Sequence, residues 1–481
     1  MLFNSLTFAI FFPTVFILYW FAAKNSVKKQ NLILLFSSYL FYGWWDYRFL
    51  FLLMFSTFLD YFTGLRIFNA RTQRSKKTWL LVSILINLGF LCFFKYYNFF
   101  IDSFATLLSY AGLKPNLWTL NIILPIGISF YTFHGLSYVL DIYNKNFKPT
   151  TDFVDYSVFV SFFPLLVAGP IERATHLLPQ VQSPRRFDYA SAVDGLRQIL
   201  WGLLKKIVIA DSCAEYTNLI FNNSDSYNGS TLVIGAVLFA FQIYGDFSGY
   251  SDIALGTARL LGFELLKNFA YPYFSRDIAE FWRRWHISLT SWFRDYVFFP
   301  LVMREKNKTA RWVKVKITFI IFLLSGLWHG ANWTFIAWGA LNAIYFLPAL
   351  LLKRPRSNFE IVAPGRLLPS IKEVVDIGLT FSMIVFAWIL FRANNTYHAY
   401  SYISKIFSRS LFRKPEVFPK ITFVLIGIFI VVEWLGREQH YAIAKLGERW
   451  PKAARWALYY ALIILILSFT GKQQKFIYFQ F

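Results

Sequence analysis

The chain has 481 residues, of which 57% are hydrophobic and 21% aromatic, and its formal net charge is +23. Long apolar runs recur from one end to the other, which excludes an ordinary soluble globular protein and is typical of a polytopic membrane protein. The positive residues are spread over many inter-helix loops, where anionic lipid headgroups explain them better than nucleic acid does. Cys92 and Cys213 lie far apart and predict neither a metal site nor a disulfide framework.

The apolar runs predict an all-α protein that forms a single transmembrane domain over residues 1–481. A bilayer core about 30 Å thick needs roughly 20 apolar residues per helix, so we expect about eleven transmembrane helices. Some of the candidate spans are too short or too interrupted to count among these. The candidates are 8–23, 32–45, 49–65, 79–94, 122–142, 153–168, 196–210, 232–244, 317–352 as two helices, 375–390, 421–435 and 457–469. Two polar insertions, around 172–194 and 353–372, are predicted to be loops.

Charges around the first span predict its orientation. No Lys or Arg precedes it, whereas Lys24, Lys28 and Lys29 follow it, which is the reverse of a cleaved signal peptide. The positive-inside tendency then places the N-terminus outside and the first loop in the cytoplasm. The loop at 66–77, with five basic residues, agrees with this assignment.

The stretch FFPLLVAGPIER, residues 162–173, contains Pro164 and the pair Gly169-Pro170 around a short apolar piece. Such a piece predicts a kinked or re-entrant helix. Its expected role is to shape a passage.

Two carboxylates follow an apolar run in YGDFSGYSDIALG, residues 244–256. Asp246 is expected at or inside the membrane boundary, where an unpaired carboxylate is costly, so a partner such as Arg283 or Arg284 is predicted. Ser251 or Asp252 is instead expected to cap a helix over 253–261. The spacing of the two Asp residues does not suit a metal site.

Residues 267–316 differ from both spans and loops, because ten basic and four acidic residues between Arg276 and Lys316 are interleaved with aromatic ones. At helical spacing, one face collects Phe281, Trp285, Leu289, Trp292 and Tyr296. This pattern predicts a helix at the membrane interface with its aromatic side toward lipid. Its arginines either contact only lipid phosphate or serve a substrate.

The segment 317–352 contains no Asp, Glu, Lys or Arg, and its one ionisable side chain is His329. As one helix its 36 residues would extend about 54 Å, so it must break, and Gly330-Ala331-Asn332 is the best position. Irregular backbone at membrane depth has to face protein or a cavity. A desolvated, neutral His329 can act as a general base; the alternative is a histidine satisfied by a backbone carbonyl.

Several of these stretches together resemble one family. FWRRWHISLTSWFRDYVFFPL, GLWHGANWTF, DFSGYSDIA, FFPLLVAGPIER and ISFYTFHGLSYVLDIY occur in the order typical of the bacterial membrane-bound O-acyltransferases, whose type member is the membrane subunit of alginate O-acetylation. The resemblance covers essentially the whole chain. It implies a multi-helix enzyme in the bacterial inner membrane, with re-entrant and interfacial helices around a central tunnel.

The resemblance also implies roles for individual residues. His329 falls on the catalytic histidine and His286 on an accessory one. The expected substrate-binding residues are Asp246, Arg283, Arg284, Trp285, Trp328 and Asn332. No metal and no tightly bound cofactor is expected.

The implied reaction moves an acyl group from a thioester donor, expected to be cytoplasmic acetyl-CoA, to a hydroxyl of an envelope polysaccharide. His329 either deprotonates that hydroxyl or becomes acylated itself. The guanidinium groups of Arg283, Arg284 and Arg294 could attract CoA phosphates. A separate periplasmic or surface acetyltransferase is the expected protein partner.

Two other readings stay open on the sequence. A glycan transporter or flippase would use Asp246 as a proton relay, although no internal repeat is visible. An assembly subunit would only recruit a secreted acyltransferase. The acceptor polymer is equally open among alginate, cellulose, peptidoglycan and other polysaccharides.

Overall fold

The computed structural model describes residues 1–24, 26–113, 119–120, 122–167, 169–308, 310–351, 358–470, 474 and 476–477. Every regular element within these ranges is a helix, which confirms the predicted all-α class. Contacts divide the chain into two compact units. The first comprises Met1–Ala192 with Ala258–Leu266, and the second comprises Val193–Thr257 with Lys267–Phe481.

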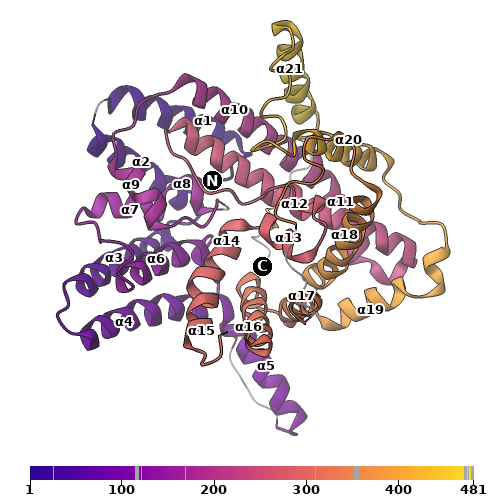
Figure 1. Cartoon of the computed structure of the whole chain (residues 1–481), viewed down its shortest axis with the longest axis horizontal. Helices are drawn as coiled ribbons and strands as arrows, with labels where there is room; N and C mark the ends of the chain where they lie inside the picture. Colours follow the sequence, from indigo (N-terminus) through magenta and orange to yellow (C-terminus); the bar gives the residue numbers. More distant parts are fainter. Residues whose placement is uncertain are drawn as a thin grey trace. The chain divides into compact units, whose positions relative to one another are not determined.

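The first unit consists of helices, several of which are capped at their N-terminus by a polar side chain. Its α-helices are α1 (Leu6–Ile17), α2 (Val27–Gly43), α3 (Tyr47–Asn69), α4 (Gln73–Leu91), α5 (Tyr97–Tyr110), α6 (Ile128–Tyr143), α7 (Phe153–Ser161), α8 (Phe163–Leu166) and α9 (Ala174–Gln182). Side-chain oxygens of Ser5, Asp46, Thr72 and Asp152 each accept a backbone N–H at a helix start. Helices α3, α4 and α6 lie side by side (Figure 1), so the apolar faces of consecutive spans cover one another.

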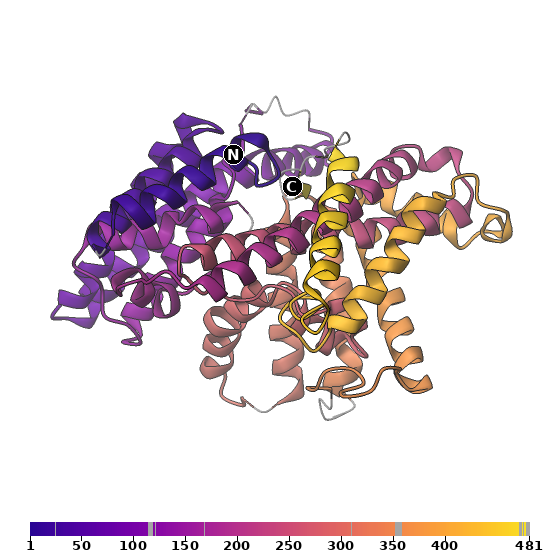
Figure 2. The same ribbon diagram turned by 90° about the horizontal axis from the view of Figure 1, so that it is seen from above.

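The second unit holds all of the predicted site residues. Its helices are α10 (Tyr189–Leu203), which begins in the first unit, the π-helix η3 (Leu204–Ala210), α11 (Asp211–Asn222), α12 (Gly229–Leu260), α13 (Ile278–Arg284), α14 (Ile287–Phe293), the π-helix η6 (Arg294–Phe298), α15 (Phe299–Arg304), α16 (Arg311–His329), α17 (Trp333–Leu351), α18 (Ile371–Arg392), α19 (Thr396–Ile406), α20 (Lys420–Gly436) and α21 (Lys452–Ser468). Figure 2 shows the same ribbon from above.

Six helical segments of the described residues are long and apolar enough to cross a membrane, which agrees with a polytopic membrane protein. They are Tyr47–Asn69, Gln73–Tyr110, Gly229–Leu260, Arg311–His329, Trp333–Leu351 and Ile371–Arg392. Two shorter apolar helices are Leu6–Ala22 and Phe153–Leu166. The predicted number of about eleven spans stays a prediction.

Two predictions about helix boundaries are wrong. Residues 251–252 do not start a new helix, because α12 runs without a break from Gly229 to Leu260. The predicted loop around 172–194 contains α9, whose buried Leu177, Leu178 and Val181 give it an apolar face. In both places tertiary packing outweighs the local turn and capping signals that polar residues provide.

The kink predicted for residues 162–173 is confirmed at the start of that stretch, because α7 ends at Ser161 and α8 begins at Phe163, with Pro164 in its first turn. Proline lacks the N–H that a continuous helix would need there. Ala168 lies outside the described residues. A role for this segment in shaping a passage stays a prediction.

Helices α16 and α17 pack closely along glycines. A Cβ added at Gly326 would overlap the carbonyl oxygen of Phe335, and one added at Gly339 would overlap the carbonyl oxygen of Phe322. Glycine is therefore required at both positions by the close approach of the two backbones. The tight pair holds the C-terminal end of α16, where His329 lies.

We expect Gly326→Ala to destabilise the protein by about 1–3 kcal/mol, because overpacking forces the two helix backbones apart. The matched control is Gly378→Ala in α18, where an added Cβ meets no heavy atom within 4 Å. The control should be neutral or stabilising by up to about 1 kcal/mol, since alanine is the better helix former. Thermal unfolding of both variants in detergent measures the difference; equal melting temperatures would contradict the packing argument.

Candidate active site

The turn after His329 confirms the predicted break in the uncharged segment 317–352. Helix α16 ends at His329 and α17 begins at Trp333. Asn332 Oδ1 accepts the backbone N–H of Thr334 at 3.0 Å, and Asn332 Nδ2 donates to the carbonyl of Asn394 at 2.8 Å. Asn332 therefore caps α17 and ties the turn to the residues after α18.

The interfacial segment is not one helix, which corrects the prediction. α13 ends at Arg284 and α14 begins at Ile287, and His286 between them has a left-handed backbone with φ of +44°. The loop before α13 holds both ends of the break: the Ala270 N–H donates to the Arg284 carbonyl at 3.0 Å, and the Ile287 N–H donates to the Asn268 carbonyl at 2.9 Å. This left-handed conformation is uncommon outside glycine and has to be held by its surroundings.

The aromatic face of this segment also differs from the prediction. The side chains of Phe281, Trp285, Leu289 and Trp292 are buried within the protein, and Tyr296 is half-buried. Trp285 packs against Trp388 of α18, with ring centroids 5.0 Å apart. The aromatic residues thus form protein core beside His286 rather than a surface toward lipid.

The two predicted catalytic histidines lie close together. The ring centroids of His286 and His329 are 6.4 Å apart, and the two residues are 1% and 5% exposed. Trp328 lies near both, with centroid distances of 5.9 Å to His286 and 5.0 Å to His329. The structure therefore brings together side chains that are 43 positions apart in the sequence (329 minus 286).

Aromatic rings from other helices complete the surroundings of the two histidines. Phe247 of α12 lies 4.7 Å from the His286 ring, and Trp338 and Phe391 each lie 5.2 Å from the His329 ring, between centroids. Burial lowers the pKa of the His286 imidazole to about 3, so this ring is neutral at pH 7. Neutral imidazoles in a desolvated setting can accept or relay a proton, which is the chemistry of general acid–base catalysis.

The arginines of α13 bind the protein itself. Arg283 donates to the Asn358 carbonyl at 2.7 Å. Arg284 donates to the Ala270 carbonyl at 3.1 Å, the Glu360 carbonyl at 3.1 Å and Glu280 Oε1 at 2.8 Å. Their guanidinium groups thus fasten α13 to the segment after α17.

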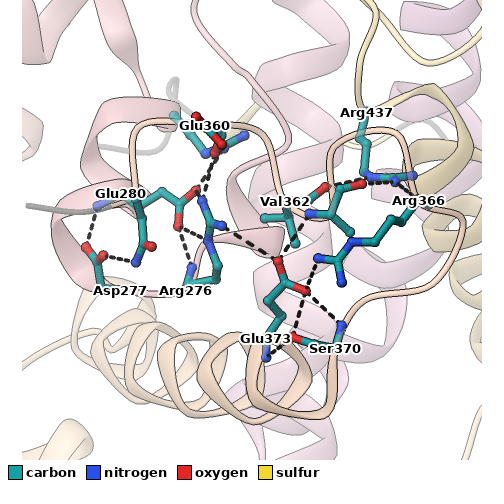
Figure 3. A network of polar contacts seen from close by, with 12 residues as sticks. Arg276, Asp277, Glu280, Glu360, Val362, Arg366, Ser370, Glu373 and Arg437 are labelled. Atoms are coloured by element: carbon teal, nitrogen blue, oxygen red, sulfur yellow. Dashed lines mark hydrogen bonds and ion pairs between the residues drawn. The ribbon is translucent and has the colours of Figure 1, made fainter.

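Arg276 and Glu280 extend this fastening (Figure 3). Arg276 pairs with Glu280 at 2.9 Å and donates to the Glu360 carbonyl at 2.7 Å. Glu373, at the start of α18, accepts from the Ser370 backbone and forms the capping box of that helix. The charges belong to one network that joins the starts of α13 and α18.

Arg437 holds the other side of the same segment (Figure 3). Its guanidinium donates to the carbonyls of Val362 and Ala363, both at 2.9 Å, and to the carbonyl of Arg366. It also donates to the Trp434 carbonyl and stacks on the Trp434 ring, 4.1 Å from the ring centroid. We call residues 358–370 the clasped loop, because arginines of α13 and Arg437 bind it from both sides.

Asp246 pairs with a lysine, which corrects the predicted pairing with Arg283 or Arg284. Lys206 Nζ lies 2.8 Å from Asp246 Oδ1 and 2.7 Å from Asp211 Oδ1. Asp246 Oδ2 accepts the backbone N–H of Ile477 at 2.7 Å. One buried lysine thus serves two buried carboxylates, and one of these also binds the C-terminal segment.

Sequence reasoning missed Lys206, Asn268 and Arg437 as structural partners of the site. Lys206 had a usable signal, because Lys205-Lys206 interrupts the apolar run 196–210 and a lysine at membrane depth is costly. Asn268 and Arg437 act through backbone groups far away in the sequence. No local pattern marks such contacts.

Comparisons with known proteins show which sequences this chain resembles. Residues 143–392 match the model of the MBOAT, membrane-bound O-acyltransferase family. The chain is 36% identical over 461 residues to a Pseudomonas aeruginosa protein named "Probable alginate O-acetylase AlgI", covering 94% of this chain and 85% of that protein. It is 30% identical to a peptidoglycan O-acetyltransferase of Helicobacter pylori, covering 100% of this chain and 98% of that protein. A teichoic acid D-alanyltransferase of Bacillus subtilis is 27% identical over 58% of this chain and 71% of that protein.

Proposed function

Because the chain belongs to the membrane-bound O-acyltransferase family, we propose that it transfers an acetyl group from cytoplasmic acetyl-CoA toward hydroxyls of a cell-envelope or exported polysaccharide. The observation that carries this proposal is the buried pair His286 and His329, whose ring centroids lie 6.4 Å apart. That separation is longer than a direct hydrogen bond between two imidazoles and suits a reacting group placed between them.

In the proposed step, the acceptor hydroxyl gives its proton to His329 while its oxygen attacks the carbonyl carbon of the thioester. The carbon–sulfur bond then breaks, and the leaving thiolate takes up the proton that His329 holds, so the products are an O-acetyl ester and a free thiol and His329 is neutral again. His329 suits the role of base because it ends α16 at a turn tied down by Asn332. A covalent acyl-histidine is the other route that the same geometry allows.

His286 is proposed as the accessory histidine. Its left-handed backbone, held by Asn268 and Ala270 through the flanking residues, fixes the direction of the Cα–Cβ bond from which the imidazole extends. Because burial keeps the ring neutral, it can accept a hydrogen bond from the acceptor or share a proton with His329. Trp328 and Trp285 then form the apolar walls that exclude water from the reacting atoms.

The remaining predicted residues are proposed to act by positioning. Arg283 and Arg284 keep α13 against the clasped loop and can still present positive charge to CoA phosphates. Asp246 is proposed to hold the interior of the second unit together through Lys206. Asn332 fixes the turn that bears His329.

The acceptor is proposed to be alginate-like, because several proteins at 33–36% identity carry the name "Probable alginate O-acetylase AlgI". We place the chain in the bacterial inner membrane with its N-terminus outside, on the positive-inside tendency of its first loops. A separate periplasmic or surface acetyltransferase is the proposed partner that completes transfer to the polymer.

The test uses purified full chain in liposomes with acetyl-labelled acetyl-CoA and a polyuronate acceptor, with and without the candidate partner enzyme. The expected result is label in a base-labile ester that depends on the chain. Label that crosses the membrane without forming an ester would indicate a transporter. Ester formation by the partner alone, at the same rate without the chain, would reduce the chain to an assembly subunit and overturn the proposal.

A further inference from the structure

The second unit contains a polar pocket whose lining includes neither His286 nor His329. It lies between α12, η3, α20 and the loops that follow α12 and α20. Tyr244, Ser248, Ser251, Asp252 and Leu255 line it from α12, at the spacing of one helix face. His440 belongs to the same lining.

Part of the charge in this pocket is already paired. Lys205 Nζ lies 2.6 Å from Asp252 Oδ2, and Gln198 Nε2 donates to Asp252 Oδ1 at 2.8 Å. The Tyr244 hydroxyl donates to Glu433 Oε2 at 2.7 Å. These contacts fix the walls and leave other polar atoms of the lining for a ligand.

Two donors and one acceptor of the lining lack partners among the described residues. The Lys267 ammonium lies 5.4 Å from the Tyr271 ring centroid, with no described carboxylate at ion-pair distance. Ser248 is 1% exposed, and its buried hydroxyl has no hydrogen-bond partner. Glu433, 4% exposed, has no described donor within hydrogen-bonding distance of its Oε1. A buried hydroxyl left in this way, such as that of Ser248, is costly unless a ligand satisfies it.

We propose that this pocket binds a phosphate group that retains one O–H. Its charged oxygens accept from the Lys267 ammonium and the Ser248 hydroxyl, and its O–H donates to Glu433 Oε1. Inorganic phosphate carries an O–H at pH 7, and so does the monoanion of a phosphate monoester, whereas sulfate and phosphodiesters carry none. A pocket that offers both donors and an acceptor therefore selects phosphate over sulfate.

The charge of Lys267 supports this site. Burial lowers the pKa of Lys267 to about 8, so the ammonium still carries its proton at pH 7. Lys267 is half-buried, and a partly desolvated cation without a carboxylate partner attracts an anion more strongly than a fully exposed lysine does, because the pocket screens it less.

The pocket is connected to the His286 turn through its own lining. Asn268, next to Lys267, accepts the Ile287 N–H with its carbonyl at 2.9 Å and the Ser288 hydroxyl with its side chain at 2.6 Å. Its Nδ2 donates to the Ser251 hydroxyl at 3.0 Å. A bound phosphate would therefore stabilise the loop that holds the first turn of α14.

The test measures binding of radiolabelled inorganic phosphate to the purified full chain in detergent, with no acyl donor present. We expect saturable binding that competing phosphate displaces at least about ten-fold more effectively than sulfate at equal ionic strength. Lys267→Met should abolish it, and Glu433→Gln should reduce the preference for phosphate over sulfate. The control Lys452→Met, at an exposed position of α21, should bind as the wild type does.

Ser248→Ala keeps the test valid if Lys267→Met fails to fold, because it removes one donor without removing a charge; a several-fold weaker affinity is expected. Displacement by CoA but not by dephospho-CoA would identify a phosphate monoester as the source, and displacement by neither would identify free phosphate. No binding by the wild type at millimolar phosphate, or equal displacement by sulfate, would overturn the proposal. Because no acyl donor is present, either failure leaves the proposed acyl transfer untouched.

Discussion

Replacing His329 with alanine is expected to lower the rate of acetyl transfer by about 10²–10⁴-fold, the range that loss of a general base gives. His329 is 5% exposed and lies at the end of α16. Among the described histidines, only His286 has its ring near that of His329, with the centroids 6.4 Å apart. His286→Ala should cause a smaller loss, because an accessory residue orients or shares a proton. Steady-state rates of ester formation in liposomes measure both effects.

The matched control for the histidine variants is His176→Gln in α9. His176 Nδ1 lies 2.8 Å from Glu172 Oε2, and a glutamine amide can replace that contact. This variant should keep wild-type activity. If His329→Ala also transferred acetyl groups at the wild-type rate, His329 would not be the base, and a protein-independent base such as water would have to be considered.

Replacing Lys206 with methionine is expected to destabilise the protein by about 3–5 kcal/mol, the cost of breaking a buried ion pair from one side. Asp211 and Asp246 lie 2.7 Å and 2.8 Å from its ammonium, and all three side chains are at most 4% exposed. The substitution would leave two buried carboxylates without their cation. Thermal unfolding in detergent, followed by the loss of monodisperse protein, measures the effect.

The neutral triple variant Lys206→Met, Asp211→Asn and Asp246→Asn separates charge from shape. It removes the uncompensated carboxylates while keeping side chains of similar size, so it should recover most of the lost stability. A triple variant as unstable as the single one would show that the hydrogen bonds to Gln474 and Ile477, rather than the charge balance, hold this region.

The sequence predicted the parts of the site that depend on membrane physics. An uncharged run too long for one span had to break beside His329, and α16 does end there. Proline chemistry likewise located a helical kink at Pro164. Both predictions follow from chain length, backbone hydrogen bonding and proline chemistry, which are local properties.

The sequence could not predict which distant groups form ion pairs with one another. Asp246 needed a cation, but Lys206 and Arg283 are equally plausible on spacing alone, and only folding brings Lys206 next to it. The aromatic pattern of residues 281–296 predicts a face toward lipid. A buried protein face has the same periodicity, and the left-handed residue His286 interrupts it without any glycine or proline to mark the position.

The clasped loop has a practical consequence for following this enzyme at work. Arg437 binds the loop through the backbone carbonyls of residues 362, 363 and 366, so outward side chains can be exchanged without loss of a clasping contact. Leu368 is 73% exposed and follows directly on that clasped backbone. A spectroscopic label on a cysteine placed there would be attached to backbone that hydrogen bonds hold in place. Its signal would report movement of α13 and α20 rather than motion of the label itself.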